Sequence, residues 1–111
     1  MSNLAAQEGQ PPKPSSKMAD SARKACEAYV ALYAVGQAKP EDLYRWSRRL
    51  MRADLKGEPT KKEPAEDHLK RMRELHTRAA ALNRAGVAGG EAWRLAVTEY
   101  YVAAAEEEYG R

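Results

Sequence analysis

A chain of 111 residues is long enough for one domain at most. Charged residues of both signs make up 32% of it, and the formal net charge is +3 at pH 7. This balance is typical of a solvated surface, whereas nucleic-acid-binding proteins usually have a more lopsided charge. Cys26 is the only cysteine, which excludes an intramolecular disulfide. No segment shows the apolar run of a signal peptide or a membrane span, so we expect a cytoplasmic protein.

The composition predicts an all-α fold with a disordered N-terminal tail. Residues 1–18 are rich in Pro, Gln and Ser, and they contain too few apolar side chains to offset the entropy of ordering. Residues 19–110 are rich in Ala, Glu, Arg and Lys, which favour helix. No part of them alternates between apolar and polar residues as a strand does. We therefore assign residues 19–110 to a single helical domain.

The first helix is predicted to start after Ser16 or Asp20 and to run to Val35. Apolar residues recur every three or four positions along it, and Cys26 lies on that stripe. A lone cysteine there is more often a small buried hydrophobe than a reactive thiol. Gly36 follows the last periodic residue, where a C-capping glycine belongs.

The second helix is predicted to run from Pro40 to about Lys56, and it carries two apolar stripes. One stripe comprises Leu43, Trp46, Leu50 and Ala53, and the other comprises Tyr44, Met51 and Leu55. A helix with two apolar stripes packs against two neighbours. Because roughly ninety ordered residues make a thin core, we expect the second stripe to lie between copies of the chain. The protein is then a homo-oligomer, a dimer or larger.

The remaining sector of this helix is filled by four arginines, Arg45, Arg48, Arg49 and Arg52. Such a face can grip the phosphates of a nucleic acid, with Lys56, Lys61 and Lys62 beyond it. A solvated face balanced by the acidic end of the fourth helix explains the same residues, and we favour that interpretation. Nucleic-acid binding is therefore the alternative function.

Residues 57–64 are predicted to be a linker, because they contain two prolines, a glycine and four charges. The third helix follows from Pro64 or Ala65 to Ala85 and is ended by Gly86. The fourth helix begins near residues 89–91 and continues to Glu108. Its predicted buried side comprises Trp93, Ala96, Val97, Tyr100, Ala103 and Ala104.

The chain contains an internal repeat with a period of fifty residues. Ala31, Leu32, Gly36, Ala38, Glu41 and Leu43 recur as Ala81, Leu82, Gly86, Ala88, Glu91 and Trp93. The two copies, residues 22–56 and 65–108, are typical of repeats built from paired helices. We predict two antiparallel hairpins, forming a bundle or a coiled-coil-like pair. In the alternative, helices fuse into longer rods: either the second joins the third, or each hairpin is one rod kinked at Gly36 or Gly86. Pro40 and the Gly89–Gly90 pair favour turns.

The polar residues form no motif of catalysis or metal binding. His68 and His76 lie about 12 Å apart along a helix, too far to hold one metal ion as neighbours on a face. Many carboxylates are four residues from a basic partner, as Glu41 is from Arg45, and such pairs stabilise helices. No serine lies in a nucleophile motif. We expect no enzyme activity, no cofactor and no metal.

A looser pattern of spacing extends over both copies. It comprises Ala28, Tyr29, Leu32, Tyr33, Gly36, Leu43, Trp46, Leu50 and Ala53, then Leu82, Gly86, Ala88, Trp93, Leu95 and Ala96. The pattern resembles the helical repeat of TolC-type bacterial outer-membrane efflux proteins, and the stretch from Gly36 to Leu50 looks like short bacterial helical proteins of similar periodicity. The resemblance covers residues 22–108 and implies helical hairpins and self-association. It does not imply export, because TolC-type proteins have membrane strands and a signal peptide and are several-fold longer.

Together these features predict a non-enzymatic helical interaction or structural module. Its expected partner is a second copy of the chain or another protein, and nucleic acid is the alternative.

Overall fold

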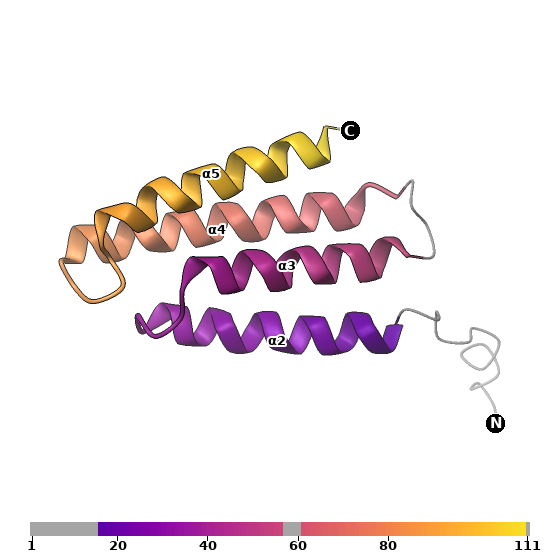
Figure 1. Ribbon diagram of the computed structural model, residues 1–111, viewed down its shortest axis with the longest axis horizontal. Coiled ribbons are helices and arrows are strands. Elements are labelled where there is room, and N and C mark those ends of the chain that lie inside the picture. The colour runs from indigo at the N-terminus through magenta and orange to yellow at the C-terminus, as the bar shows by residue number, and fades with distance from the viewer. Residues whose placement is uncertain (1–15, 57–60, 111) are drawn as a thin grey trace, which may run out of the picture.

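The computed structural model describes residues 16–56 and 61–110, which form four helices and no strand (Figure 1). The helices are α2 (Ser16–Ala34), α3 (Pro40–Leu55), α4 (Glu63–Ala85) and α5 (Ala92–Tyr109). The predicted all-α class is therefore confirmed. The predicted tail and linker lie largely outside the described residues. Where the predicted tail and linker overlap the described residues, those residues are helical: α2 begins at Ser16 and α4 begins at Glu63.

The early start of α2 has a packing reason. Ala19 is buried in a cluster with Leu50 and Ala53 of α3, so the first turn of α2 is held against its neighbour. Sequence periodicity could not show this contact, because alanine alone is a weak marker of a buried face.

The helices run up and down in chain order, and each packs against the next (Figure 1). α3 also contacts α5, whereas α2 and α5 lie at opposite edges of the array. The principal extents of 56 × 31 × 16 Å describe a thin slab. The hairpin arrangement is therefore a layer of helices in which α5 covers part of one face of α3.

Both hairpins turn at a left-handed glycine with the same hydrogen bonds. Gly36 has φ 75° and Gly86 has φ 68°. In each case the residue after the glycine donates its N–H to a leucine carbonyl, Gln37 to Leu32 at 2.8 Å and Val87 to Leu82 at 3.4 Å. This is the Schellman motif that ends many helices. The two helices therefore end in the same way at Gly36 and Gly86, and the alternative of continuous rods is wrong.

The two turns lie at the same end of the slab and touch each other. A Cβ placed on Gly36 would lie 2.6 Å from the carbonyl oxygen of Ala88, and one on Gly89 would lie 2.8 Å from the Cα of Gly36. Only glycine permits so close an approach of two backbones. The contact joins the first hairpin to the second at their tips.

The core has two parts, one on each side of α3. Leu50 and Ala53 pack against Ala22 and Cys26 of α2, whereas Leu43 belongs to a larger cluster with residues of α4 and α5. The prediction that this helix has two neighbours is confirmed. Cys26 is buried as expected, and burial raises the pKa of its thiol, which disfavours the reactive thiolate.

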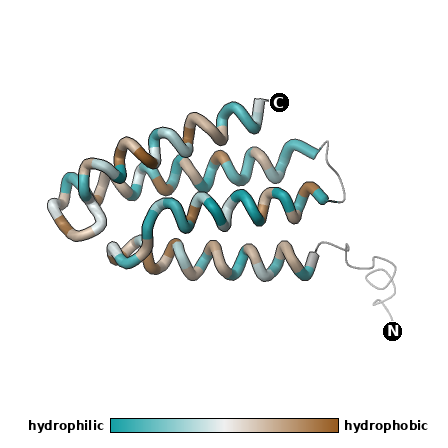
Figure 2. The backbone as a smooth tube through the Cα atoms, viewed as in Figure 1, coloured by the Kyte–Doolittle hydropathy of each residue, from teal (hydrophilic) through white to brown (hydrophobic). Residues whose placement is uncertain are grey.

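The predicted buried side of the fourth helix is wrong for most of its residues, although Val97 does pack against the core. Trp93 is 50% exposed and Tyr100 is 66% exposed, whereas Thr98, Tyr101 and Ala105 face the core. Apolar residues recur along the whole of α5 (Figure 2), so the helix carries two apolar stripes and its periodicity cannot choose between them. Contacts with other helices bury Thr98, Tyr101 and Ala105, a stripe that the apolar periodicity of the sequence did not favour.

Candidate functional site

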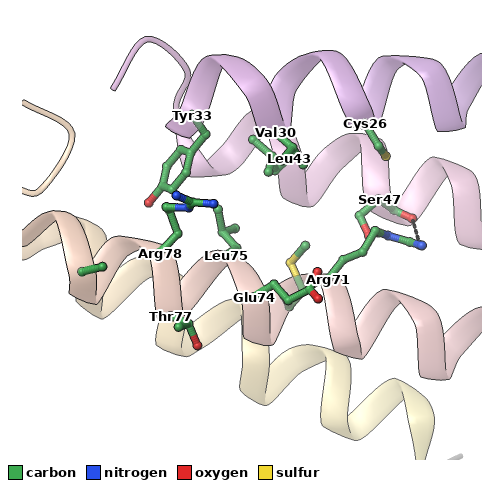
Figure 3. A pocket seen from close by; sticks show the side chains of 12 residues that line it. Cys26, Val30, Tyr33, Leu43, Ser47, Arg71, Glu74, Leu75, Thr77 and Arg78 are labelled. Atoms are coloured by element: carbon green, nitrogen blue, oxygen red, sulfur yellow. Dashed lines mark hydrogen bonds between the residues drawn. The ribbon is translucent and has the colours of Figure 1, made fainter. Parts of the chain in front are cut away.

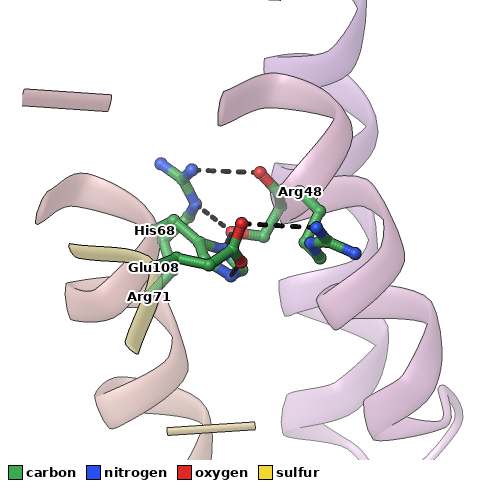
Figure 4. A network of polar contacts seen from close by, with 5 residues as sticks. Arg48, His68, Arg71 and Glu108 are labelled. Carbon is green, nitrogen blue, oxygen red and sulfur yellow. Dashed lines mark hydrogen bonds and ion pairs between the residues drawn. The ribbon is translucent and has the colours of Figure 1, made fainter. Parts of the chain in front are cut away.

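A buried polar network joins α3, α4 and α5 (Figure 4). Arg71 of α4 donates from Nε to the Ser47 hydroxyl at 2.6 Å and from its terminal nitrogen to the Ser47 carbonyl at 3.3 Å. The same hydroxyl lies 2.6 Å from Nδ1 of His68. Because Arg71 can only donate, the hydroxyl accepts from it, and the same hydroxyl can either donate to or accept from Nδ1, according to the His68 tautomer.

Glu108 closes this network from α5. One of its oxygens accepts from Arg48 at 3.3 Å, and the other lies 3.9 Å from Nε2 of His68, which is too long for a hydrogen bond. The pKa of His68 is lowered to about 4, first by desolvation and then by the positive charges of Arg71 and Arg48. The imidazole is accordingly neutral at pH 7.

This network links neighbouring helices through hydrogen bonds and an ion pair. Ser47 is 1% exposed and His68 is 0% exposed, so both side chains are enclosed by the surrounding helices. The ring of His76 makes a comparable contact, with Nδ1 2.7 Å from the Thr98 hydroxyl of α5. Both histidines therefore bond to a hydroxyl of a neighbouring helix. No group that could hold a metal ion occurs among residues 16–56 and 61–110.

The stripe expected to join two copies of the chain is covered by the chain itself. Tyr44 stacks on Tyr101 of α5, with ring centroids 4.2 Å apart and an interplanar angle of 6°. Met51 is 4% exposed, and Leu55 is half-buried. The second neighbour of α3 is therefore α4 with α5, and these three residues do not form a free surface for a second copy.

The four arginines of the predicted face differ in whether they make ion pairs. Arg45 bonds to Glu41 at 3.0 Å, and Arg48 bonds to Glu108 at the acidic end of α5. The interpretation as a face balanced by that acidic end therefore holds for Arg48. Arg49 instead lies over the Trp46 ring at 4.5 Å, and within the described part of the chain neither Arg49 nor Arg52 makes an ion pair.

A groove of about 590 Å³ lies between α2 and α4, on the side of α3 opposite Arg49 and Arg52 (Figure 3). Its apolar lining includes Val30, Tyr33 and Leu43, and Arg71 extends along it to Ser47. This volume is typical of a small-molecule pocket. Its charged side chains are of both signs, so its electrostatics favour neither an anionic nor a cationic ligand.

The outer edge of α5 is the surface that sequence reasoning placed in the core. Trp93, Ala96, Tyr100 and Ala103 recur at intervals of three and four residues, and all four are exposed. This spacing is that of a coiled-coil seam. The four residues therefore form an exposed stripe on an edge helix.

Comparison of the chain with protein-family models, with curated proteins and with solved structures found no match in any of the three. The resemblance to TolC-type repeats therefore remains a prediction. None of the described helices has both the length and the hydropathy needed to cross a membrane. The function must be argued from the surfaces of the chain itself.

Proposed function

We propose that this protein is a non-enzymatic helical module that pairs with a second copy of itself through the outer edge of α5. The observation that carries the proposal is the exposed seam of Trp93, Ala96, Tyr100 and Ala103. The surface differs from the one that the sequence suggested, because Tyr44, Met51 and Leu55 are occupied within the chain.

The order of large and small residues along this seam is self-complementary. Suppose that two α5 helices pair antiparallel about a two-fold axis at the level of residue 98. Trp93 then lies opposite the partner's Ala103, and Tyr100 lies opposite the partner's Ala96. Each large side chain meets a small one, which is how helices interdigitate at close distance. A two-fold interface needs this reciprocity, which supports a second copy over an unrelated partner.

The expected strength follows from the aromatic side chains. Complete burial of a large apolar side chain contributes about 1.5–3 kcal/mol, and Tyr100 has about two-thirds of its surface left to bury. Because each substitution acts twice in a symmetric dimer, Tyr100→Ala should weaken the dimer by about 2–4 kcal/mol. This is roughly a thirtyfold to thousandfold increase in the dissociation constant.

Analytical ultracentrifugation across a concentration series tests the proposal. Wild type should sediment as a dimer at concentrations where Tyr100→Ala sediments as a monomer. Val30→Glu is the matched control, because Val30 is also an exposed apolar residue, at 49%, but lies on α2. A wild type that stays monomeric at high micromolar concentration, or an equal effect of the control, would refute the proposal.

Cysteine cross-linking tests the helix direction. In the antiparallel pair, a mixture of Ala96→Cys and Tyr100→Cys chains should form a disulfide-linked heterodimer. Ala103→Cys alone should not cross-link, because its two copies lie about 15 Å apart along the axis. The reverse result would indicate a parallel pair and would exclude the large-to-small register.

A further inference from the structure

A second surface is independent of self-association and lies on the opposite side of α3 from the groove. A hollow of about 880 Å³ opens here between α2 and α3. Among the residues that the structure describes, every charged side chain that lines it is basic: Lys17, Arg49, Arg52 and Lys56. The arrangement joins the first turn of α2 to the second half of α3, a proximity that only the antiparallel packing of these helices creates.

The charges of this hollow are not compensated by the described part of the chain. None of its four basic side chains makes an ion pair with a residue in 16–56 or 61–110. A smaller hollow of about 340 Å³ adjoins it, since Arg49 and Arg52 line both. There Arg45 and Arg48 also line the surface, but each is held in an ion pair, Arg45 with Glu41 and Arg48 with Glu108. Among the described residues, the positive charge of α3 that makes no ion pair therefore lies along the larger hollow.

The hollow also contains an aromatic side chain. Trp46 lies in its lining, half-buried, and the Arg49 guanidinium lies 4.5 Å from its ring centroid. Along α3, Arg45, Arg49, Arg52 and Lys56 are about one turn apart and together span about 16 Å. Proteins that bind single-stranded nucleic acid combine these elements, namely a row of cations that follows the backbone and an aromatic ring that stacks on a base.

We propose that the cationic hollow between α2 and α3 binds single-stranded DNA or RNA, with phosphates on Arg49, Arg52 and their lysine neighbours and a base on Trp46. A single strand fits better than a duplex, because only an unpaired base can reach the indole ring. A membrane surface fits less well. Of the large hydrophobic side chains that are exposed, only Met18 lines the hollow, and surface-bound helices need several apolar side chains beside the basic ones.

Fluorescence anisotropy with a labelled 12-nucleotide strand of mixed sequence, as DNA and as RNA, tests this site. Four cations that each neutralise a phosphate give a slope of log K against log salt of about −2.8. Affinity should then fall about fiftyfold between about 50 and 200 mM salt. Arg49→Gln with Arg52→Gln should weaken binding at least tenfold and reduce the slope by about half.

The matched control is Lys70→Gln with Arg78→Gln, which changes the net charge equally on exposed residues of α4 that line neither hollow. This control should bind as wild type does. An equal loss of affinity in the control would show that net charge alone drives binding, and it would overturn the proposed site. Circular dichroism at 222 nm checks that both double variants remain folded.

Tryptophan fluorescence gives a second readout. Bound oligonucleotide should quench the wild-type emission. In Trp46→Phe, where Trp93 of α5 supplies the remaining signal, the quenching should disappear. Three results would overturn the proposal: no oligonucleotide binding at about 50 mM salt, quenching that persists in Trp46→Phe, or binding to phosphatidylserine vesicles without binding to oligonucleotides. The last result would identify the hollow as a lipid-headgroup site.

Discussion

The two hairpin glycines differ in one respect, and this difference gives a sharp test of the structure. Both have a positive φ, which costs a residue with a Cβ about 1–2 kcal/mol. The alanine variant recovers part of this through the lower entropy of its unfolded chain, about 0.4–1 kcal/mol. Gly86→Ala meets no other atom within 4 Å. It should therefore destabilise the protein by about 1 kcal/mol.

Gly36→Ala carries an additional cost. Its Cβ would lie 2.6 Å from the carbonyl oxygen and 3.0 Å from the carbonyl carbon of Ala88. These atoms belong to the backbone of the second turn, so relief requires the two hairpin tips to separate. Forced overpacking of this kind adds about 1–3 kcal/mol. We expect a total loss of about 2–4 kcal/mol.

Thermal and urea unfolding of the two variants measure this difference. For a domain of this size, a loss of 1 kcal/mol lowers Tm by about 4–8 °C. Gly86→Ala should shift Tm by about that amount, and Gly36→Ala by at least twice as much. Equal shifts would show that the hairpin tips do not touch. Higher stability in either variant would show that its glycine lies within a continuous helix, where alanine is the better residue.

Three further predictions concern the interior. Because the pKa of His68 is lowered to about 4, the unfolded chain binds a proton before the folded one does. Unfolding free energy should therefore fall from pH 6.5 to about 4, by up to about 3 kcal/mol, and His68→Gln should flatten this dependence in urea titrations. Tyr101→Ala should cost about 3–5 kcal/mol and Tyr101→Phe far less, and a double-mutant cycle with Tyr44→Ala should give a coupling of about 1 kcal/mol for the stacked rings. Cys26→Ser should destabilise more than Cys26→Ala, because it places a hydroxyl in an apolar cluster; equal unfolding midpoints would contradict this.

Much of the local structure could be predicted from the sequence because its causes are local. Gly36 and Gly86 end helices because only a residue without Cβ adopts the left-handed conformation easily, and Pro40 begins a helix because its fixed φ suits the first turn. These effects act within one turn of the chain. The helix limits and the hairpin turns therefore agree with prediction to within a few residues.

The surfaces could not be predicted in the same way. Ser47 interrupts the apolar sectors of α3, but nothing in its own segment shows that His68 and Arg71, more than twenty residues away, complete its hydrogen bonds. The cationic hollow likewise needs Lys17 beside Arg52, which are 35 positions apart. Residues so far apart in sequence meet only after the helices pack.

The sequence by itself therefore determined four helices, their ends and their order in two hairpins, because propensity and capping depend on neighbouring residues. Only the tertiary structure decided which sides of α3 and α5 are buried. Both α3 and α5 carry two apolar stripes. Contacts with other helices, such as Tyr101 with Tyr44 and Thr98 with His76, determine which stripe is buried. That choice exposed Trp93 and Tyr100, covered the stripe expected to join two copies, and left Arg49 and Arg52 facing solvent without an ion pair among the described residues.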